Sequence, residues 1–180
     1  ELEEIERSWA IESAPANLSE MSETQARKQI EETQALRQVH CSKLDLSNQV
    51  WPKNIVIENC VVDELLLNGA TMENGFAIER SQIKSLNAKS LVTHDSFRLN
   101  KVFLAEDATF DEADFSGVAL FESVVFNKSA NFRGTQFRKL AHFHVRFRGQ
   151  GRFRKVYFYD ESYFNRIASL APLNFELATF

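Results

Sequence analysis

The phenylalanines of this chain recur at intervals that neither a helix nor an ordinary strand produces. From Phe110 to Phe143 the successive intervals are 5, 6, 5, 6, 5 and 6 residues, whereas a helix repeats every 3.6 residues and a strand every 2. The residues two places before these phenylalanines are small or β-branched: Ala108, Ala113, Ala119, Val124, Ala130, Thr135 and Ala141. The chain therefore repeats a five-residue unit, small-x-Phe-x-x, with an extra residue in alternate units.

The same unit extends over most of the chain once aliphatic residues are allowed at the phenylalanine position. It can be followed from Leu44 to Phe180, and every fourth unit marks a longer period of 21 or 22 residues. The positions on this longer period are Ile57, Ile78, Leu99, Phe121, Phe143 and Phe164. A coil with four short sides would stack them in one column, and stacked coils bury their inward side chains together. We therefore predict an all-β solenoid of about six and a half coils over residues 44–180.

Two copies of the unit carry a resemblance to a known family. Ala113-Asp114-Phe115-Ser116-Gly117 and Ala130-Asn131-Phe132-Arg133-Gly134 resemble the repeat of the pentapeptide-repeat family. The resemblance covers roughly residues 44–180 and implies a right-handed quadrilateral β-helix. It departs from the family pattern between Val145 and Gly151, where Phe147 comes one place early and Arg148 falls at an inward position. We expect a bulge or small loop there.

Residues 1–43 lack the repeat and are predicted to form a helical N-terminal segment or cap. Ser22 and Gln25 fit a capping box, and a helix is expected from about Met21 to Val39. As a cap it would shield the first coil from edge pairing, and the alternative is a stalk or coiled-coil lead-in. Pro15 separates it from a shorter amphipathic segment that contains Leu2, Ile5 and Trp9.

At the other end, the final unit closes on Phe180 with no cap after it. We expect either that the natural chain continues or that a partner or second copy covers this end. A homodimer through the uncapped C-terminal coil is one expectation.

Residue patterns that support catalysis or metal binding are missing. His142 and His144 flank inward Phe143 and should point outward, while His40 and Cys41 lack partners at a metal-ligand spacing. The two cysteines do not form a redox motif, and neither a phosphate-binding glycine loop nor a nucleophile-and-base pattern occurs. We predict that the protein is not an enzyme and uses no cofactor or metal. Reduced cysteines suit a cytoplasmic location.

Charge is distributed very unevenly along the chain. The formal net charge is −4, yet no Asp or Glu lies between Asn127 and Tyr159, where nine residues are basic. Eight of them define a candidate anion-binding belt: Arg133, Arg138, Lys139, Arg146, Arg148, Arg152, Arg154 and Lys155. Arg133 and Arg154 are 21 residues apart and should stack in adjacent coils. An ordinary explanation is an Asp111-Arg133-Arg154-Glu176 ladder of compensating charges, because Asp111 and Glu176 occupy the equivalent places one coil before and after.

Three functions remain open from the sequence. The first is a rigid, non-catalytic interaction or scaffold module that binds a protein partner through flat faces of the solenoid. The second comes from the family resemblance, which implies that the acidic coils from Asp45 to Glu122 could mimic DNA and bind a type II topoisomerase. The third is an anion-binding module whose belt meets nucleic acid or lipid, as in the soluble part of a membrane-tethered protein. Fold alone does not choose among them.

Overall fold

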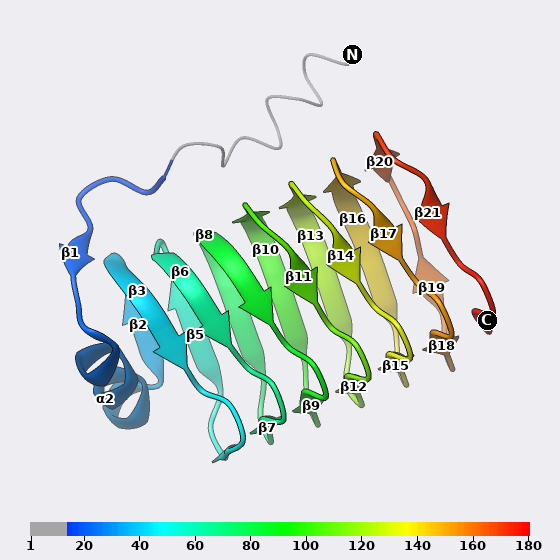
Figure 1. The fold of residues 1–180 in the computed structure, drawn as a ribbon. Coiled ribbons are helices and arrows are strands. Elements are labelled where there is room, and N and C mark those ends of the chain that lie inside the picture. Colours follow the sequence, from blue (N-terminus) through cyan, green and yellow to red (C-terminus); the bar gives the residue numbers. More distant parts are fainter. Residues whose placement is uncertain (1–13) are drawn as a thin grey trace.

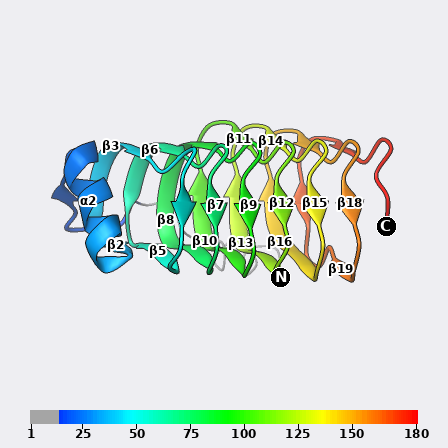
Figure 2. The same cartoon turned by 90° about the horizontal axis from the view of Figure 1, so that it is seen from below.

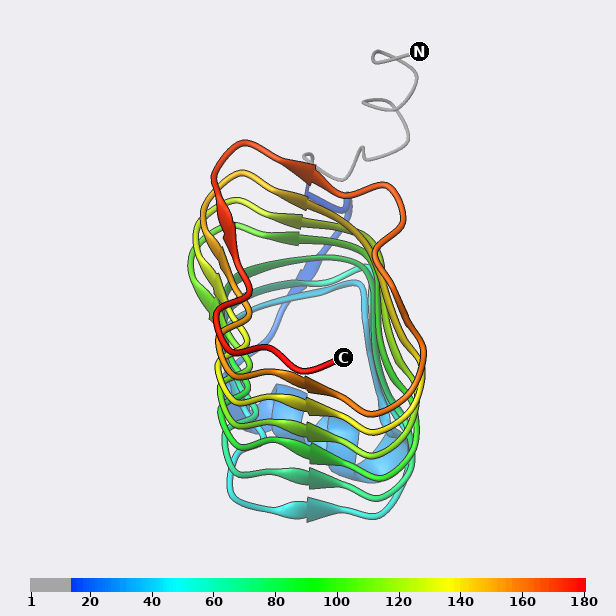
Figure 3. The same ribbon diagram turned by 90° about the vertical axis from the view of Figure 1, so that its right-hand side faces the viewer.

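A computed structural model describes residues 14–180, which form a β-solenoid of about seven coils (Figure 1). The sequence therefore predicted the class of fold correctly, and the structure repeats about every 21 residues. The amphipathic segment with Leu2, Ile5 and Trp9 lies outside the described residues. Figure 3 looks along the solenoid and shows the coils stacked on one another in a four-sided outline.

The elements alternate short strands with corners. One helix, α2, covers Glu23–Thr33. The strands are β1 (Ser19–Glu20), β2 (Ala35–Arg37), β3 (Val39–Asp45), β4 (Val50–Trp51), β5 (Ile55–Glu58), β6 (Val61–Leu66), β7 (Thr71–Met72), β8 (Phe76–Asn87), β9 (Val92–Thr93), β10 (Phe97–Leu104), β11 (Ala108–Thr109), β12 (Asp114–Phe115), β13 (Ala119–Phe126), β14 (Ala130–Asn131), β15 (Gln136–Phe137), β16 (Ala141–Phe147), β17 (Gly151–Arg152), β18 (Tyr157–Phe158), β19 (Ser162–Tyr163), β20 (Ala168–Ser169) and β21 (Leu173–Asn174).

Neighbouring coils pair through parallel strands in two sheets. A six-stranded sheet, β18-β15-β12-β9-β7-β4, forms one side, and a 15-stranded sheet contains the strands of the other three sides. Long strands such as β8 turn a corner without leaving the sheet, because Arg80 adopts a left-handed conformation with φ of 45°. Most backbone hydrogen bonds of a coil thus join it to the next coil, and a few close turns within the coil, as from Thr135 N–H to the carbonyl of Phe132.

The core consists of four columns of inward side chains. One column runs Ile57, Ile78, Leu99, Phe121 and Phe143, paired residue by residue between coils. In another column, the rings of Phe110, Phe132, Phe153 and Phe175 stack with centroids 4.7 or 4.8 Å apart and planes within 9° of parallel. Rings of adjacent columns meet edge to face, as Phe121 and Phe132 do at 80°. Stacked and edge-to-face arrangements are both favourable for aromatic pairs.

The helix is shorter than the sequence suggested, and the first coil starts earlier. Ser22 and Gln25 form the expected capping box, but α2 ends at Thr33 because Gln34 is left-handed with φ of 58°. Leu36 pairs with Ile57 and is fully buried, so it belongs to an inward column rather than to a helix. Val39 likewise begins β3, so the expected helix from Met21 to Val39 is wrong beyond residue 33.

The predicted irregularity between Val145 and Gly151 has a different form. The structure contains no loop at the inward position: Phe147 pairs with Phe126, and their rings stack at 5.1 Å. Arg148 therefore does not point into the core, as the sequence suggested. The register shift lies between Glu122 and Val124 of β13, because β16 lacks a counterpart of left-handed Ser123. One residue fewer at this corner moves Phe147 into its column.

Candidate anion-binding surface

The eight residues of the predicted belt lie on three sides of the solenoid. Arg146 and Arg148 lie at and just beyond the end of β16. Arg138 follows β15 in the six-stranded sheet, with exposed Lys139 beside it. The remaining residues follow or belong to β14 and β17: Arg133, Arg152, Arg154 and Lys155. The structure thus brings together only part of the belt. We call the outward side of β11, β14, β17 and β21 the β14–β17 face.

A shallow hollow of about 380 Å³ lies on the β14–β17 face. The side chains that line it come from four adjacent coils: Asp111, Asn131, Arg133, Arg152, Arg154, Asn174 and Glu176. Asn131, Arg152 and Asn174 are register partners in successive strands. The backbone N–H of Gly134 donates to the carbonyl of Arg154 at 3.0 Å, which places Arg133 and Arg154 at equivalent points of adjacent coils. Equivalent positions are about 4.8 Å apart along the solenoid.

The predicted Asp-Arg-Arg-Glu ladder forms at only one end. Arg154 pairs with Glu176 at 3.4 Å. Asp111, however, accepts a hydrogen bond from the backbone N–H of Arg133 at 3.0 Å. Within residues 14–180, the Arg133 guanidinium itself has neither an ion pair nor a hydrogen bond. The ladder therefore leaves one arginine charge without a direct partner.

Arg152 adds a second positive charge, and no carboxylate of residues 14–180 pairs with it. Its Nε and Nη2 both donate to Gln150 Oε1, at 3.1 and 2.5 Å, and its Nη1 donates to Asn131 Oδ1 at 3.2 Å. These neutral partners fix the guanidinium in place without neutralising it. Asn174 Oδ1 also accepts one hydrogen bond, from the backbone N–H of Glu176 at 2.8 Å. Each of the two asparagine oxygens thus already accepts one hydrogen bond, whereas their NH₂ groups donate to none of the described residues.

Arg138 is engaged elsewhere. It forms a two-pronged ion pair with Asp114, with Nε–Oδ1 and Nη2–Oδ2 distances of 2.8 and 2.7 Å. Arg138 holds the pKa of Asp114 below its usual range, and its guanidinium lies 5.5 Å from the ring centroid of Tyr159. This arginine therefore contributes to the structure of the six-stranded sheet rather than to the hollow.

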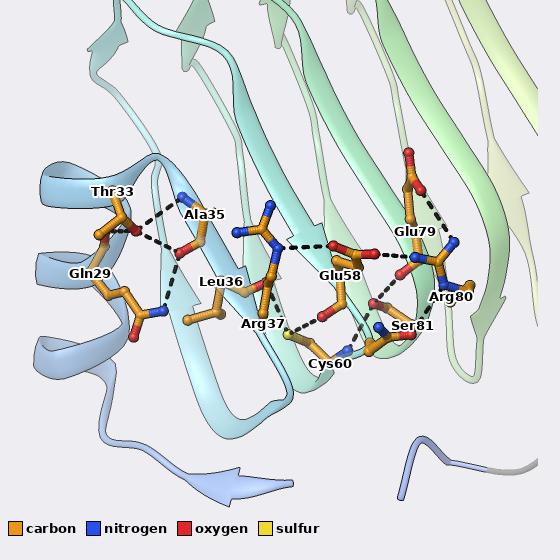
Figure 4. A network of polar contacts seen from close by, with 11 residues as sticks. Gln29, Thr33, Ala35, Leu36, Arg37, Glu58, Cys60, Glu79, Arg80 and Ser81 are labelled. Carbon is orange, nitrogen blue, oxygen red and sulfur yellow. Dashed lines mark hydrogen bonds and ion pairs between the residues drawn. The ribbon is translucent and has the colours of Figure 1, made fainter.

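An ion network near the N-terminal end was not predicted. Figure 4 shows Glu58 between Arg37, from the strand before it, and Arg80, from the strand after it. The Arg37 Nε–Glu58 Oε2 distance is 2.9 Å, and the pKa of Glu58 is lowered chiefly by this bond. The spacing of Arg37, Glu58 and Glu79 by 21 residues would have indicated the row. It was missed because the repeat was not extended upstream of Leu44.

His40 also has partners that the sequence did not reveal. Its Nδ1 lies 2.9 Å from Glu20 Oε1, and its Nε2 lies 3.6 Å from Asp63 Oδ2. The hydrogen bond with Glu20 is the main reason that the pKa of His40 is raised. Glu20 belongs to β1, which pairs with β3, whereas Asp63 belongs to β6 on the other side of β3. The histidine therefore joins three adjacent strands.

Other chemistry-bearing groups are dispersed or buried. Cys41 and Cys60 are fully buried free thiols, and burial raises the pKa of Cys41 to about 12. Residues 14–180 contain no group of three or more His, Cys, Asp or Glu side chains arranged to hold a metal ion. None of the helices in the described part of the chain is long and apolar enough to span a membrane.

Comparison of the chain with protein-family models, with curated proteins and with solved structures found no match.

Proposed function

We propose that this chain is a pentapeptide-repeat protein that acts as a rigid, non-catalytic interaction module for a protein partner. One observation carries the proposal: outward side chains of successive coils lie in register, on strands that are bonded to both neighbours. Ring stacks 4.7–5.1 Å apart support these strands from inside. A partner could therefore bind pre-ordered rows of side chains at little conformational cost.

The β14–β17 face is the part of the rod that we assign to this role. Its hollow contains Arg133 and Arg152, whose charges lack carboxylate partners in the described residues. By contrast, several acids of the coils up to Glu122 are already paired, as Glu58 is with Arg37 and Glu122 with Arg98. Such pairs weaken the acidic field that a DNA mimic would need, so we favour a protein partner.

A capture experiment with matched variants tests the proposal. Immobilised wild-type chain, an Arg152→Glu/Arg154→Glu variant and a Lys84→Glu/Lys101→Glu variant would be incubated with a lysate of the source organism. The control residues are exposed, lie on other sides of the solenoid and undergo the same charge change. We expect the wild type and the control to retain the same saturable protein, and the Arg152→Glu/Arg154→Glu variant to lose it.

The far-UV circular dichroism spectrum of each variant would first verify that the solenoid is intact. Equal capture by all three proteins would refute the assignment of this face. The absence of any saturable protein partner would refute the proposed function itself.

A further inference from the structure

We infer that the hollow on the β14–β17 face binds one phosphate-type group, presented as a phosphomonoester by the protein partner. The inference rests on the proposed function, because it names the group by which the partner is recognised. The hollow is lined by Asp111, Asn131, Arg133, Arg152, Arg154, Asn174 and Glu176.

In its centre, unused hydrogen-bond donors outnumber unused acceptors. The amide oxygens of Asn131 and Asn174 already accept bonds, from Arg152 Nη1 and from the backbone N–H of Glu176. Their NH₂ groups and the guanidinium of Arg133 have no acceptor in the part of the chain that the structure describes. A ligand that fits this set must be an acceptor at several atoms, as the oxygens of a phosphate are.

The charges at the centre point to the same ligand. Among the described residues, no carboxylate pairs with the guanidinium of Arg133 or of Arg152. Exposed Lys155 follows Arg154 in the chain and adds a further positive charge to this region. The bonds to Gln150 and Asn131 hold the Arg152 guanidinium in one orientation before any ligand arrives. Guanidinium groups bind phosphate through paired N–H donors, and an ordered guanidinium loses less entropy on binding.

The ends of the hollow limit the size of the anion. Asp111 lies one coil before Arg133, and Glu176 lies one coil after Arg154, so carboxylates border the hollow in both directions along the solenoid. A long polyanion that follows the rod would meet these carboxylates, whereas a single phosphate group would fit between them. The chain outside residues 127–159 contains 25 acidic and 12 basic residues, which opposes nucleic acid and anionic membranes.

Solution NMR of the purified chain would test the site with inorganic phosphate and with phenyl phosphate, a simple phosphomonoester. At constant ionic strength, we expect both probes to shift the side-chain N–H signals of Arg133 and Arg152 in a saturable manner. An Arg133→Gln/Arg152→Gln variant should bind at least about tenfold more weakly, because charge-assisted hydrogen bonds are lost. A Lys84→Gln/Lys101→Gln control, with the same change in net charge, should match the wild type.

Three outcomes would overturn the inference. The first is the absence of saturable shifts at these arginines, and the second is equal weakening in the control variant. The third is tighter binding of heparin or phosphatidylserine vesicles than of phenyl phosphate, with the same preference in both glutamine variants.

Capture from lysate treated with phosphatase separates this inference from the proposed function. We expect the partner to be retained from untreated lysate and lost after phosphatase treatment. Retention after treatment would leave the protein-partner role standing and refute the phosphate group. Phosphate binding by the purified chain without any captured protein would support the site and refute the protein-partner role.

Discussion

Thr93 and Thr135 occupy buried positions, but only one of their hydroxyl groups has a partner. Thr135 Oγ1 donates to the carbonyl of Phe110 at 2.7 Å, whereas Thr93 Oγ1 has no hydrogen bond to the described residues. A buried polar group without a partner costs roughly 1–3 kcal/mol. We expect Thr93→Val to raise the free energy of unfolding by about 1 kcal/mol, and Thr135→Val to lower it by about 1 kcal/mol. Urea denaturation measures the change in unfolding free energy for each variant. Changes of the same sign would show that the hydrogen bond of Thr135 does not distinguish the two threonines.

His40 makes the stability of the first coils depend on pH. Its pKa is raised from 6.5, chiefly by the hydrogen bond with Glu20. Folding therefore favours protonated His40. The stabilisation from its interaction with Glu20 is complete below pH 6.5, and it disappears as the pH rises through the raised pKa of the folded state. We expect the difference in unfolding free energy between wild type and His40→Gln to shrink from pH 6 to about pH 9.

Asp63 is the other acid that faces His40, so Asp63→Asn should reduce part of the pH dependence. A pH-independent effect of His40→Gln would rule out this ion pair as a source of stability.

At the scale of the strand, one recurring corner uses residues in a left-handed conformation. Four residues lie two places after an inward residue of the same column and have φ between 45° and 54°: Asn59, Arg80, Lys101 and Ser123. A left-handed conformation costs a non-glycine residue about 1–2 kcal/mol, and glycine adopts it freely. The chain tolerates this cost because the corner is fixed by parallel bonds to both neighbouring coils.

Lys101 offers a clean test, because it is exposed and forms no ion pair with other described residues. We expect Lys101→Gly to raise the free energy of unfolding by roughly 0.5–1 kcal/mol, after allowance for the greater freedom of glycine in the unfolded chain. Lys84→Gly is the matched control within β8, where glycine should lower stability by a similar amount. Thermal denaturation of both variants checks the sign, and destabilisation by Lys101→Gly would contradict the prediction.

The repeat predicted the columns well because inward burial depends directly on residue type. Phe110, Phe132 and Phe153 stack where the period placed them. The period failed where the coil changes length: Phe147, not Arg148, fills the column, because burying a guanidinium group among the phenylalanines would cost far more than removing one corner residue. Local helix propensity placed Leu36 in the predicted helix. In the structure Leu36 lies in a strand instead, because burial beside Ile57 outweighs that propensity.

The candidate site was predictable only in part. The interval of 21 residues correctly placed Arg133 and Arg154 in adjacent coils. It could not indicate that Asp111 bonds to the backbone of Arg133 rather than to its guanidinium, since side-chain conformation decides this. The interval also could not show that Arg138 lies apart from the hollow. Its pairing with Asp114 depends on which side of the solenoid each residue occupies.

At the scale of the whole molecule, α2 covers the N-terminal end of the solenoid (Figure 2). Ala26 and Ile30 are the buried residues of the helix, and they join the core that the coils share. Solenoids need such covers, because an exposed first coil presents unpaired apolar side chains and strand edges.

We expect Ile30→Asp to detach the helix, because a carboxylate would have to be buried against the first coil. The expected results are a loss of roughly 3 kcal/mol or more in the free energy of unfolding and concentration-dependent association through the exposed end. Thr24→Asp, an exposed position of the same helix, should have neither effect. Urea denaturation and light scattering measure the two results, and a stable monomeric Ile30→Asp variant would show that the cover is dispensable.

Pairing between successive coils also determines how the molecule should respond to a mechanical load. Within residues 14–180, the strands of each coil of about 21 residues pair with the coil before and the coil after. When the chain is pulled by its two ends, the terminal coils should peel away in turn, each releasing roughly 70 Å of extended chain. Stretching single molecules should give a series of evenly spaced force peaks rather than one large rupture. Such a rod would yield gradually under tension and re-form coil by coil when the tension falls.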